Sequence, residues 1–163
     1  MNIRIRTTVI AVALIASLAA PAIASASTNW SLDVNLASYH LERWARQSLN
    51  QHNLGLGVTR YLTRNVSVSA GFYRNSYRRT SEYALVNFTP LHVALPGGWA
   101  LAAGATGGLD FGYRRCEIQS APWVAAGLLR VVAPGSWSLN LTAVPNAGAG
   151  RSGFIGVQMS MPL

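Results

Sequence analysis

Eight stretches of this chain alternate, residue by residue, between apolar side chains and small or polar ones. In the clearest of them, Val66–Arg74, two valines, an alanine and a phenylalanine alternate with two serines, a glycine and a tyrosine. A period of two residues is typical of a β-strand whose two faces have unlike surroundings. The stretches are Trp30–Tyr39, Asn53–Leu62, Val66–Arg74, Ser81–Thr89, Trp99–Gly108, Pro122–Val131, Trp137–Val144 and Ile155–Leu163.

The segments between these stretches alternate between short and long. Thr63–Asn65 and Ala133–Gly135 are tight turns, and the longer segments are Leu41–His52, Asn75–Thr80, Leu109–Ala121 and Pro145–Ser152. Short turns at one end and long loops at the other are typical of outer-membrane barrels. Pro90–Gly98 does not fit, because its prolines predict an edge-like break or a gap in strand pairing.

The N-terminal residues predict a secretory signal peptide. Two arginines precede an apolar run, Val9–Leu18, and Ala24–Ala26 is a small-x-small cleavage site. We therefore assign residues 1–26 to the signal and 27–163 to one domain, with cleavage two or four residues earlier, or an uncleaved helical anchor, as alternatives.

The composition favours strands that face lipid. Half of the residues are hydrophobic and 11% are charged, whereas a soluble domain carries about a quarter charged residues. No later run approaches the ~20 apolar residues of a membrane helix. We therefore predict an all-β, eight-stranded antiparallel up-and-down transmembrane barrel in the outer membrane of a Gram-negative-type cell. A soluble barrel with its apolar face inside is the alternative, but its outer surface would be poor in charge.

All 13 Lys and Arg positions are arginines, and eight of the eleven arginines after residue 26 are expected at the rim with the long loops. The arginines expected at that rim are Arg43, Arg46, Arg74, Arg78, Arg79, Arg114, Arg115 and Arg151. Guanidinium groups bind phosphates bidentately, so lipid headgroup phosphates are the expected partner and nucleic acid is not. The alternative is that loops are simply polar.

The second face of the strands is rich in Gly, Ala, Ser, Thr and Asn. An eight-stranded barrel is just wide enough for side chains to fill it. Small inward residues would leave a slot for one acyl chain, or they would merely relieve crowding.

A candidate site lies at the long-loop rim. His40 ends the first strand, and Asn75 and Ser76 follow the third, roughly 10 Å away by strand spacing. A histidine, an amide and a serine are suited to acyl chemistry through a nucleophile or a general base. Each could instead be an ordinary strand-end or turn residue.

The sequence resembles the lipid A palmitoyltransferase family, the PagP-like outer-membrane barrels. The resemblance covers most of the domain and rests on Tyr39–His40, Leu54–Gly57, Phe72–Tyr77, Gly104–Gly108 and Leu139–Pro145. It implies transfer of a fatty acyl chain from a phospholipid to lipid A, with the chain held in the lumen. His40, Asn75 and Ser76 then fall on the family's catalytic His, Asp and Ser.

The chain departs from the family in three respects. Asn75 replaces the aspartate, the first loop is short, and no amphipathic helix precedes the first strand. An asparagine can orient a histidine but cannot balance an imidazolium, so the resemblance predicts that Asn75→Asp raises activity. The family's chain-measuring glycine falls near Asn87, so palmitate selectivity is not carried over.

The mechanism we expect uses His40 as base, with His52 as the weaker candidate, Ser76 as nucleophile or oxyanion donor, and Asn75 to orient or polarise. Arg74, Arg78 and Arg79 would hold phosphates. We expect no bound metal, because the histidines do not have the spacing of metal ligands. We also expect no cofactor. We expect a monomer, with Cys116 as a free or intermolecular thiol. A lipid A deacylase and a non-catalytic barrel that binds lipid or lipopolysaccharide are the alternatives.

Overall fold

A computed structural model describes residues 29–118, 121–146 and 152–163. The predicted signal peptide, 1–26, and Arg151 lie outside the described residues. The eight strands form a closed antiparallel barrel in the order β1-β2-β3-β4-β5-β6-β7-β8, so the predicted all-β, eight-stranded barrel is confirmed. The strands are β1 (Trp30–His40), β2 (His52–Tyr61), β3 (Val66–Arg74), β4 (Thr80–Ala94), β5 (Ala100–Phe111), β6 (Trp123–Val132), β7 (Ser138–Val144) and β8 (Phe154–Pro162).

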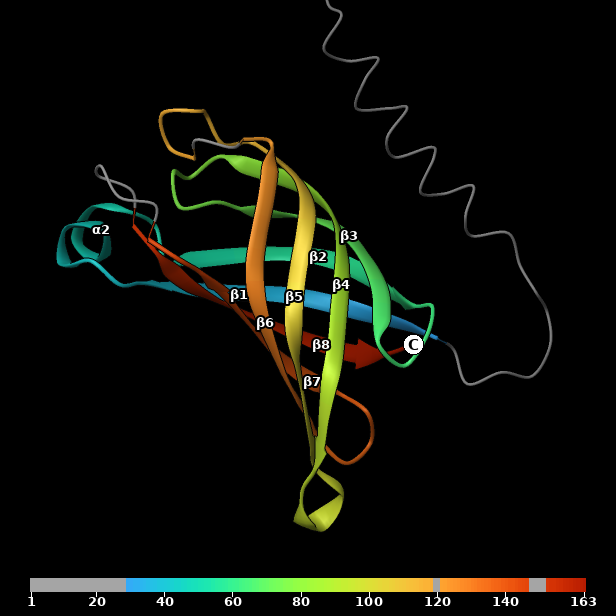
Figure 1. Ribbon diagram of the computed structural model, residues 1–163. Coiled ribbons are helices and arrows are strands. Elements are labelled where there is room, and N and C mark those ends of the chain that lie inside the picture. The colour runs from blue at the N-terminus through green and yellow to red at the C-terminus, as the bar shows by residue number, and fades with distance from the viewer. Residues whose placement is uncertain (1–28, 119–120, 147–151) are drawn as a thin grey trace, which may run out of the picture.

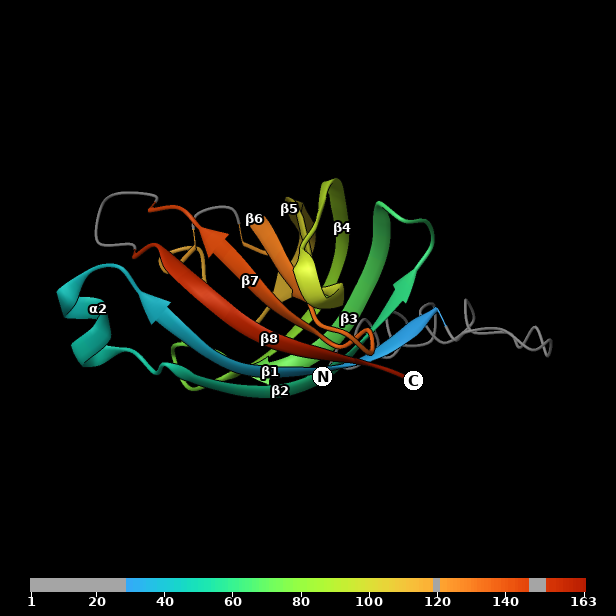
Figure 2. The ribbon, with the colours of Figure 1, turned by 90° about the horizontal axis from the view of Figure 1, so that it is seen from below.

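The two ends of the barrel differ. At one end, here called the loop end, the longer connections carry α2 (Arg43–Ser48), a short helix that the sequence reading did not predict. At the other, the turn end, lie tight connections such as η1 (Pro96–Gly98) and the C-terminus. In Figure 1, α2 and the C-terminus lie on opposite sides of the molecule, and Figure 2 shows the same separation from below. Within the described residues, no helix is long and apolar enough to cross a membrane.

The apolar faces of the strands point outward. Leu56, Phe72 and Val86 are each about half exposed, whereas their neighbours along the strands, such as Thr59 and Ser69, are buried. The outer surface is therefore apolar and the lumen is lined largely by small and polar residues. This orientation is the predicted one, although apolar residues of β4 and β6, namely Leu85, Val124, Ala126 and Leu128, also point into the lumen.

A bulge in β1 decides which way its last residues point. The pairing with β8 shifts between Asn35, opposite Gln158, and Ala37, opposite Val157. The extra residue reverses the alternation, so His40 is 2% exposed while Tyr39 is 55% exposed. Without the bulge, His40 would share the outward face of Trp30.

The predicted gap in pairing at Pro90–Gly98 is confirmed at Thr89 and Pro90, but β4 does not end there. The strand continues through Pro90 to Ala94, with a register shift between Phe88 and Leu91. A proline lacks an N–H, and a bulge is one place in a sheet that tolerates one. The segment therefore contributes paired strand as well as a turn, in which Gly97 and Gly98 have positive φ angles of 74° and 79°.

The lumen is filled with hydrogen-bonded side chains at the turn end. Asp33 accepts hydrogen bonds from Thr59, at 2.6 Å, and from Ser160. The network continues from Thr59 to Ser69 at 2.8 Å, and from Asn87 to Ser69 at 2.6 Å. On the other side of Asp33 it includes Asn140, whose Nδ2 donates to Ser160 and whose Oδ1 accepts from Arg130. We call these seven residues the plug.

Candidate functional site

The loop-end half of the lumen contains a cavity of about 550 Å³. Its apolar lining includes Leu85, Val124, Ala126, Leu128, Val144 and Phe154. Glu117 and Ile118, from the β5–β6 connection, also line it, so the cavity extends to the loop end. The small inward residues therefore leave a space that extends from the loop end inward as far as the plug, five residues of which also line it: Thr59, Ser69, Asn87, Arg130 and Asn140.

Tyr83 lines the cavity and projects into the lumen near Asn35 and Gln158. Its hydroxyl is 3.5 Å from Nδ2 of Asn35 and 3.3 Å from Nε2 of Gln158. A Cβ atom at Gly57 or Gly71 would lie 2.3 or 2.7 Å from this hydroxyl. The two glycines therefore leave room for the Tyr83 ring to lie across the lumen.

A cluster of hydroxyl groups and one carboxyl lines the cavity near the loop end. Tyr73 donates a 2.6 Å hydrogen bond to Oδ2 of Asp110, and its hydroxyl is 3.3 Å from that of Tyr113. Tyr113 in turn hydrogen-bonds Ser76, and burial raises the pKa of Tyr113 to about 12. Its hydroxyl therefore stays protonated near neutral pH and can act as a hydrogen-bond donor.

Ser76 is buried and lines the cavity. Its carbonyl accepts a 2.8 Å hydrogen bond from the backbone N–H of Asn50, which follows α2. This bond ties the β3–β4 loop to the first loop. The Ser76 hydroxyl is thus held at the cavity wall beside Tyr113.

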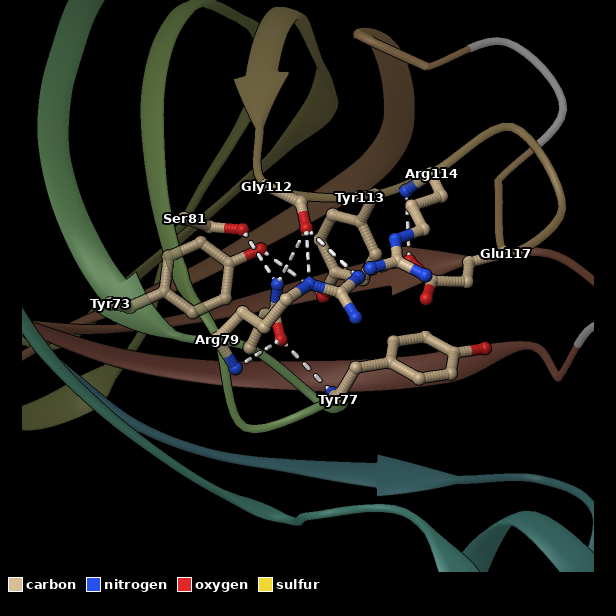
Figure 3. A network of polar contacts seen from close by, with 9 residues as sticks. Tyr73, Tyr77, Arg79, Ser81, Gly112, Tyr113, Arg114 and Glu117 are labelled. Carbon is tan, nitrogen blue, oxygen red and sulfur yellow. Dashed lines mark hydrogen bonds and ion pairs between the residues drawn. The ribbon is translucent and has the colours of Figure 1, made fainter.

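Asn75 is fully buried, and its side chain organises the β3–β4 loop through contacts with Tyr77, Arg79, Ser81 and Gly112, which Figure 3 labels. Its Oδ1 accepts 3.0 Å hydrogen bonds from the backbone N–H groups of Tyr77 and Arg79. Its Nδ2 donates to Oγ of Ser81 at 3.1 Å and to the carbonyl of Gly112 at 3.2 Å. None of these four hydrogen bonds, which join described residues, goes to His40.

His40 lies at the same end of the barrel as Ser76 but does not line the cavity. Its ring packs against Phe154 with a centroid distance of 5.7 Å, and Phe154 does line the cavity. Among the described residues, its Nδ1 has no hydrogen-bond partner. Ser38, two residues earlier, donates a 2.7 Å hydrogen bond to Asn53, whose Nδ2 bonds the carbonyl of Arg74. This chain of contacts links the strand ends that carry His40 and Ser76.

The three arginines predicted to hold phosphates differ in their contacts. Arg79 forms an ion pair with Glu117, donates to the carbonyl of Gly112 at 3.0 and 3.1 Å, and stacks on Tyr77. Figure 3 shows the Arg79 side chain extended along Gly112. Arg74 and Arg78, in contrast, are exposed at the loop end.

Sequence reasoning missed Tyr73, Asp110 and Tyr113 as parts of the site. The available signal was Asp110, an acidic residue just past a stretch that is otherwise apolar or small. Within the described part of the chain, no three His, Cys, Asp or Glu side chains are grouped so as to hold a metal ion. No family model matches the sequence, and no curated protein matches it significantly.

Proposed function

We propose that this chain is an outer-membrane barrel of a Gram-negative-type cell that holds the acyl chain of a lipid in its lumen. The observation that carries the proposal is the cavity of about 550 Å³, which is walled by apolar side chains and bounded by Tyr83 and the plug. Ligand pockets typically measure about 300–1,000 Å³ and have mostly apolar walls with a few polar groups.

The outer surface supports placement in a membrane. Exposed aromatic residues lie near both ends of the barrel, with Trp99 and Trp137 at the turn end and Phe111 and Trp123 at the loop end. Membrane barrels carry an apolar band between two such girdles. The exposed arginines at the loop end, including Arg74 and Arg78, are placed to contact lipid phosphates.

A cavity-filling variant tests acyl-chain binding. Ala126 lines the cavity, so Ala126→Trp should abolish binding of the fluorescent fatty acid parinaric acid to the purified protein in amphipol. Ala143 is exposed on the outer face of the neighbouring strand, so Ala143→Trp is the matched control and should bind like the wild type. Unchanged binding by a folded Ala126→Trp protein would exclude the lumen as the site.

A second candidate function is acyl transfer from a phospholipid to lipid A. It is favoured by the Ser76 hydroxyl on the cavity wall, beside the protonated Tyr113, and by the unpartnered Nδ1 of His40 at the same rim. If Ser76 is the nucleophile, its oxygen would form an ester with the acyl group, and the phospholipid C–O ester bond would break. His40 would take the proton of Ser76 and give it to the leaving lysophospholipid alcohol, and a lipid A hydroxyl would then displace Ser76 from the acyl group. If Ser76 instead stabilises the oxyanion, the lipid A hydroxyl would attack directly, with His40 passing its proton to the leaving alcohol. Hydrolysis, with water as acceptor, would use the same groups.

Membranes with radiolabelled phospholipid separate these functions. Label in lipid A indicates transfer, free fatty acid indicates hydrolysis, and unchanged phospholipid indicates a barrel that only binds. His40→Ala and Ser76→Ala should each abolish either activity. Activity that survives both substitutions would show that these residues do not take part in the mechanism. The proposal of acyl-chain binding would still be tested separately by Ala126→Trp.

A further inference from the structure

Two side chains that line the cavity have polar atoms without hydrogen-bond partners among the described residues. They are Oδ1 of Asp110 and Oγ1 of Thr106, and both residues are more than nine-tenths buried. Both lie on β5, four residues apart and on the same inward face. Buried polar groups in proteins are nearly always paired, so these two atoms call for partners inside the cavity.

The carboxyl of Asp110 is held in place. Its other oxygen accepts the hydrogen bond from Tyr73, and Ser81 lies beside it. The nearby guanidinium of Arg79 is already occupied by Glu117 and the carbonyl of Gly112. Ser81 hydrogen-bonds the carboxyl as well. The carboxyl is therefore fixed among hydroxyl groups at the cavity wall, and its Oδ1 has no hydrogen-bond partner among the described residues.

We propose that the cavity selects an acyl chain that carries a hydroxyl group close to its polar head, and that Oδ1 of Asp110 accepts the hydrogen bond of this hydroxyl. The proposal rests on the proposed acyl-chain binding and specifies the class of chain. A plain chain would cover Oδ1 and leave it unpaired, and a site built to bind a hydroxyl strongly rejects the analogue that lacks it. A cationic head is disfavoured because exposed arginines, Arg74 and Arg78 among them, lie at the loop end.

The position of Asp110 fixes where the hydroxyl must be. Asp110 is the last inward residue of β5 before the loop end, and Thr106 lies about 13 Å further into the barrel by the rise of a strand. A hydroxyl near the head of the chain would meet Asp110. A hydroxyl at the far end of the chain would not reach Asp110. Comparing ligands with the hydroxyl at either end therefore distinguishes recognition by Asp110 from a general preference for polar ligands.

Displacement of parinaric acid from the purified full chain in amphipol tests the proposal. The probes are myristate, β-hydroxymyristate, ω-hydroxymyristate and tetradecylamine. We expect the wild type to bind β-hydroxymyristate about tenfold more tightly than myristate, as one hydrogen bond to a fixed carboxyl would give. In Asp110→Leu this preference should fall to about onefold, whereas in Glu82→Leu, which removes a carboxyl exposed on the outer face of β4, it should persist.

The outcomes separate this inference from the function on which it rests. Equal binding of myristate and β-hydroxymyristate by the wild type would overturn the inference and leave acyl-chain binding intact. Tightest binding of ω-hydroxymyristate or of tetradecylamine would also overturn it. Failure of all four probes to displace parinaric acid would overturn the proposed function itself. The wild-type comparison decides the matter even if Asp110→Leu does not fold.

Discussion

The barrel holds two buried aspartates in its lumen, and their surroundings differ. Asp33, in the plug, has both carboxyl oxygens paired, one with Thr59 and one with Ser160. Asp110, at the cavity, has one oxygen paired with Tyr73 and one without a described partner. The aspartate near the turn end therefore has both carboxyl oxygens hydrogen-bonded, whereas the aspartate near the loop end has one oxygen to which a ligand could donate a hydrogen bond.

The difference comes from the side chains on the neighbouring strands. Around Asp33 these are hydroxyl, amide and guanidinium groups, and in a narrow barrel such groups reach one another across the lumen. Around Asp110 the hydroxyl groups of Tyr73 and Ser81 reach one side of the carboxyl, whereas Val124 and Ala126 on the adjacent strand β6 donate no hydrogen bonds. A fully paired network stabilises the fold, whereas a partly paired one indicates a place for something else to bind.

The largest effect should come from removing the acid of the plug. Asp33→Ala leaves Thr59 and Ser160 without their acceptor and should lower the free energy of unfolding by about 3 kcal/mol. Asp110→Ala removes a carboxyl that already has one oxygen without a partner among the described residues, and it should cost about 1 kcal/mol. Urea unfolding followed by tryptophan fluorescence measures both. Equal losses would contradict the division of the lumen into plug and cavity.

A smaller effect is expected at the boundary between plug and cavity. A Cβ atom at Gly71 would lie 2.4 Å from the carbonyl oxygen of Leu56 and 2.6 Å from Cα of Gly57, so the backbone would have to move. Gly71→Ala should therefore lower the free energy of unfolding by about 1–3 kcal/mol. Gly127→Ala, whose Cβ would meet nothing nearer than 3.9 Å, is the control and should change it little. The same urea titration compares the two variants.

Asn75→Asp separates the resemblance from the observed geometry. An aspartate cannot donate to the carbonyl of Gly112, as Nδ2 of Asn75 does, so we expect a loss of about 1–2 kcal/mol in unfolding free energy. The resemblance instead predicts a gain in acyl transfer. A variant that is both more active and as stable as the wild type would show that the Asn75 contacts do not position the loop. Labelled-phospholipid assays and urea unfolding on the same preparation provide both readouts.

The smallest effect should come from the ion pair at the rim. Arg79 is 35% exposed at its side chain, and partly exposed ion pairs contribute little because water and salt screen them. Arg79→Gln should therefore cost less than about 1 kcal/mol, and the neighbouring exposed Arg78→Gln should cost about nothing. Thermal unfolding at low and high salt tests this, since only the Arg79 variant should lose its salt dependence.

Part of the site could be predicted from sequence. The histidine and the serine were placed at the loop-end rim, and the structure puts both strand ends there. That His40 points inward could not be predicted, because a one-residue bulge reversed the alternation of β1. The contacts of Asn75 with Gly112, and those among Tyr73, Asp110 and Tyr113, join segments far apart in the chain, so no local pattern reports them.

The sequence by itself determined the eight strands and their two unlike faces, because a period of two residues lies in the local order of the side chains, and eight such strands in a chain poor in charge predicted the closed barrel. It could not determine that Pro90 would be accommodated within β4, or that one half of the lumen would be filled and the other open. Those outcomes depend on which inward side chains face one another across the barrel. Cross-strand register sets that, and only the assembled tertiary structure fixes the register.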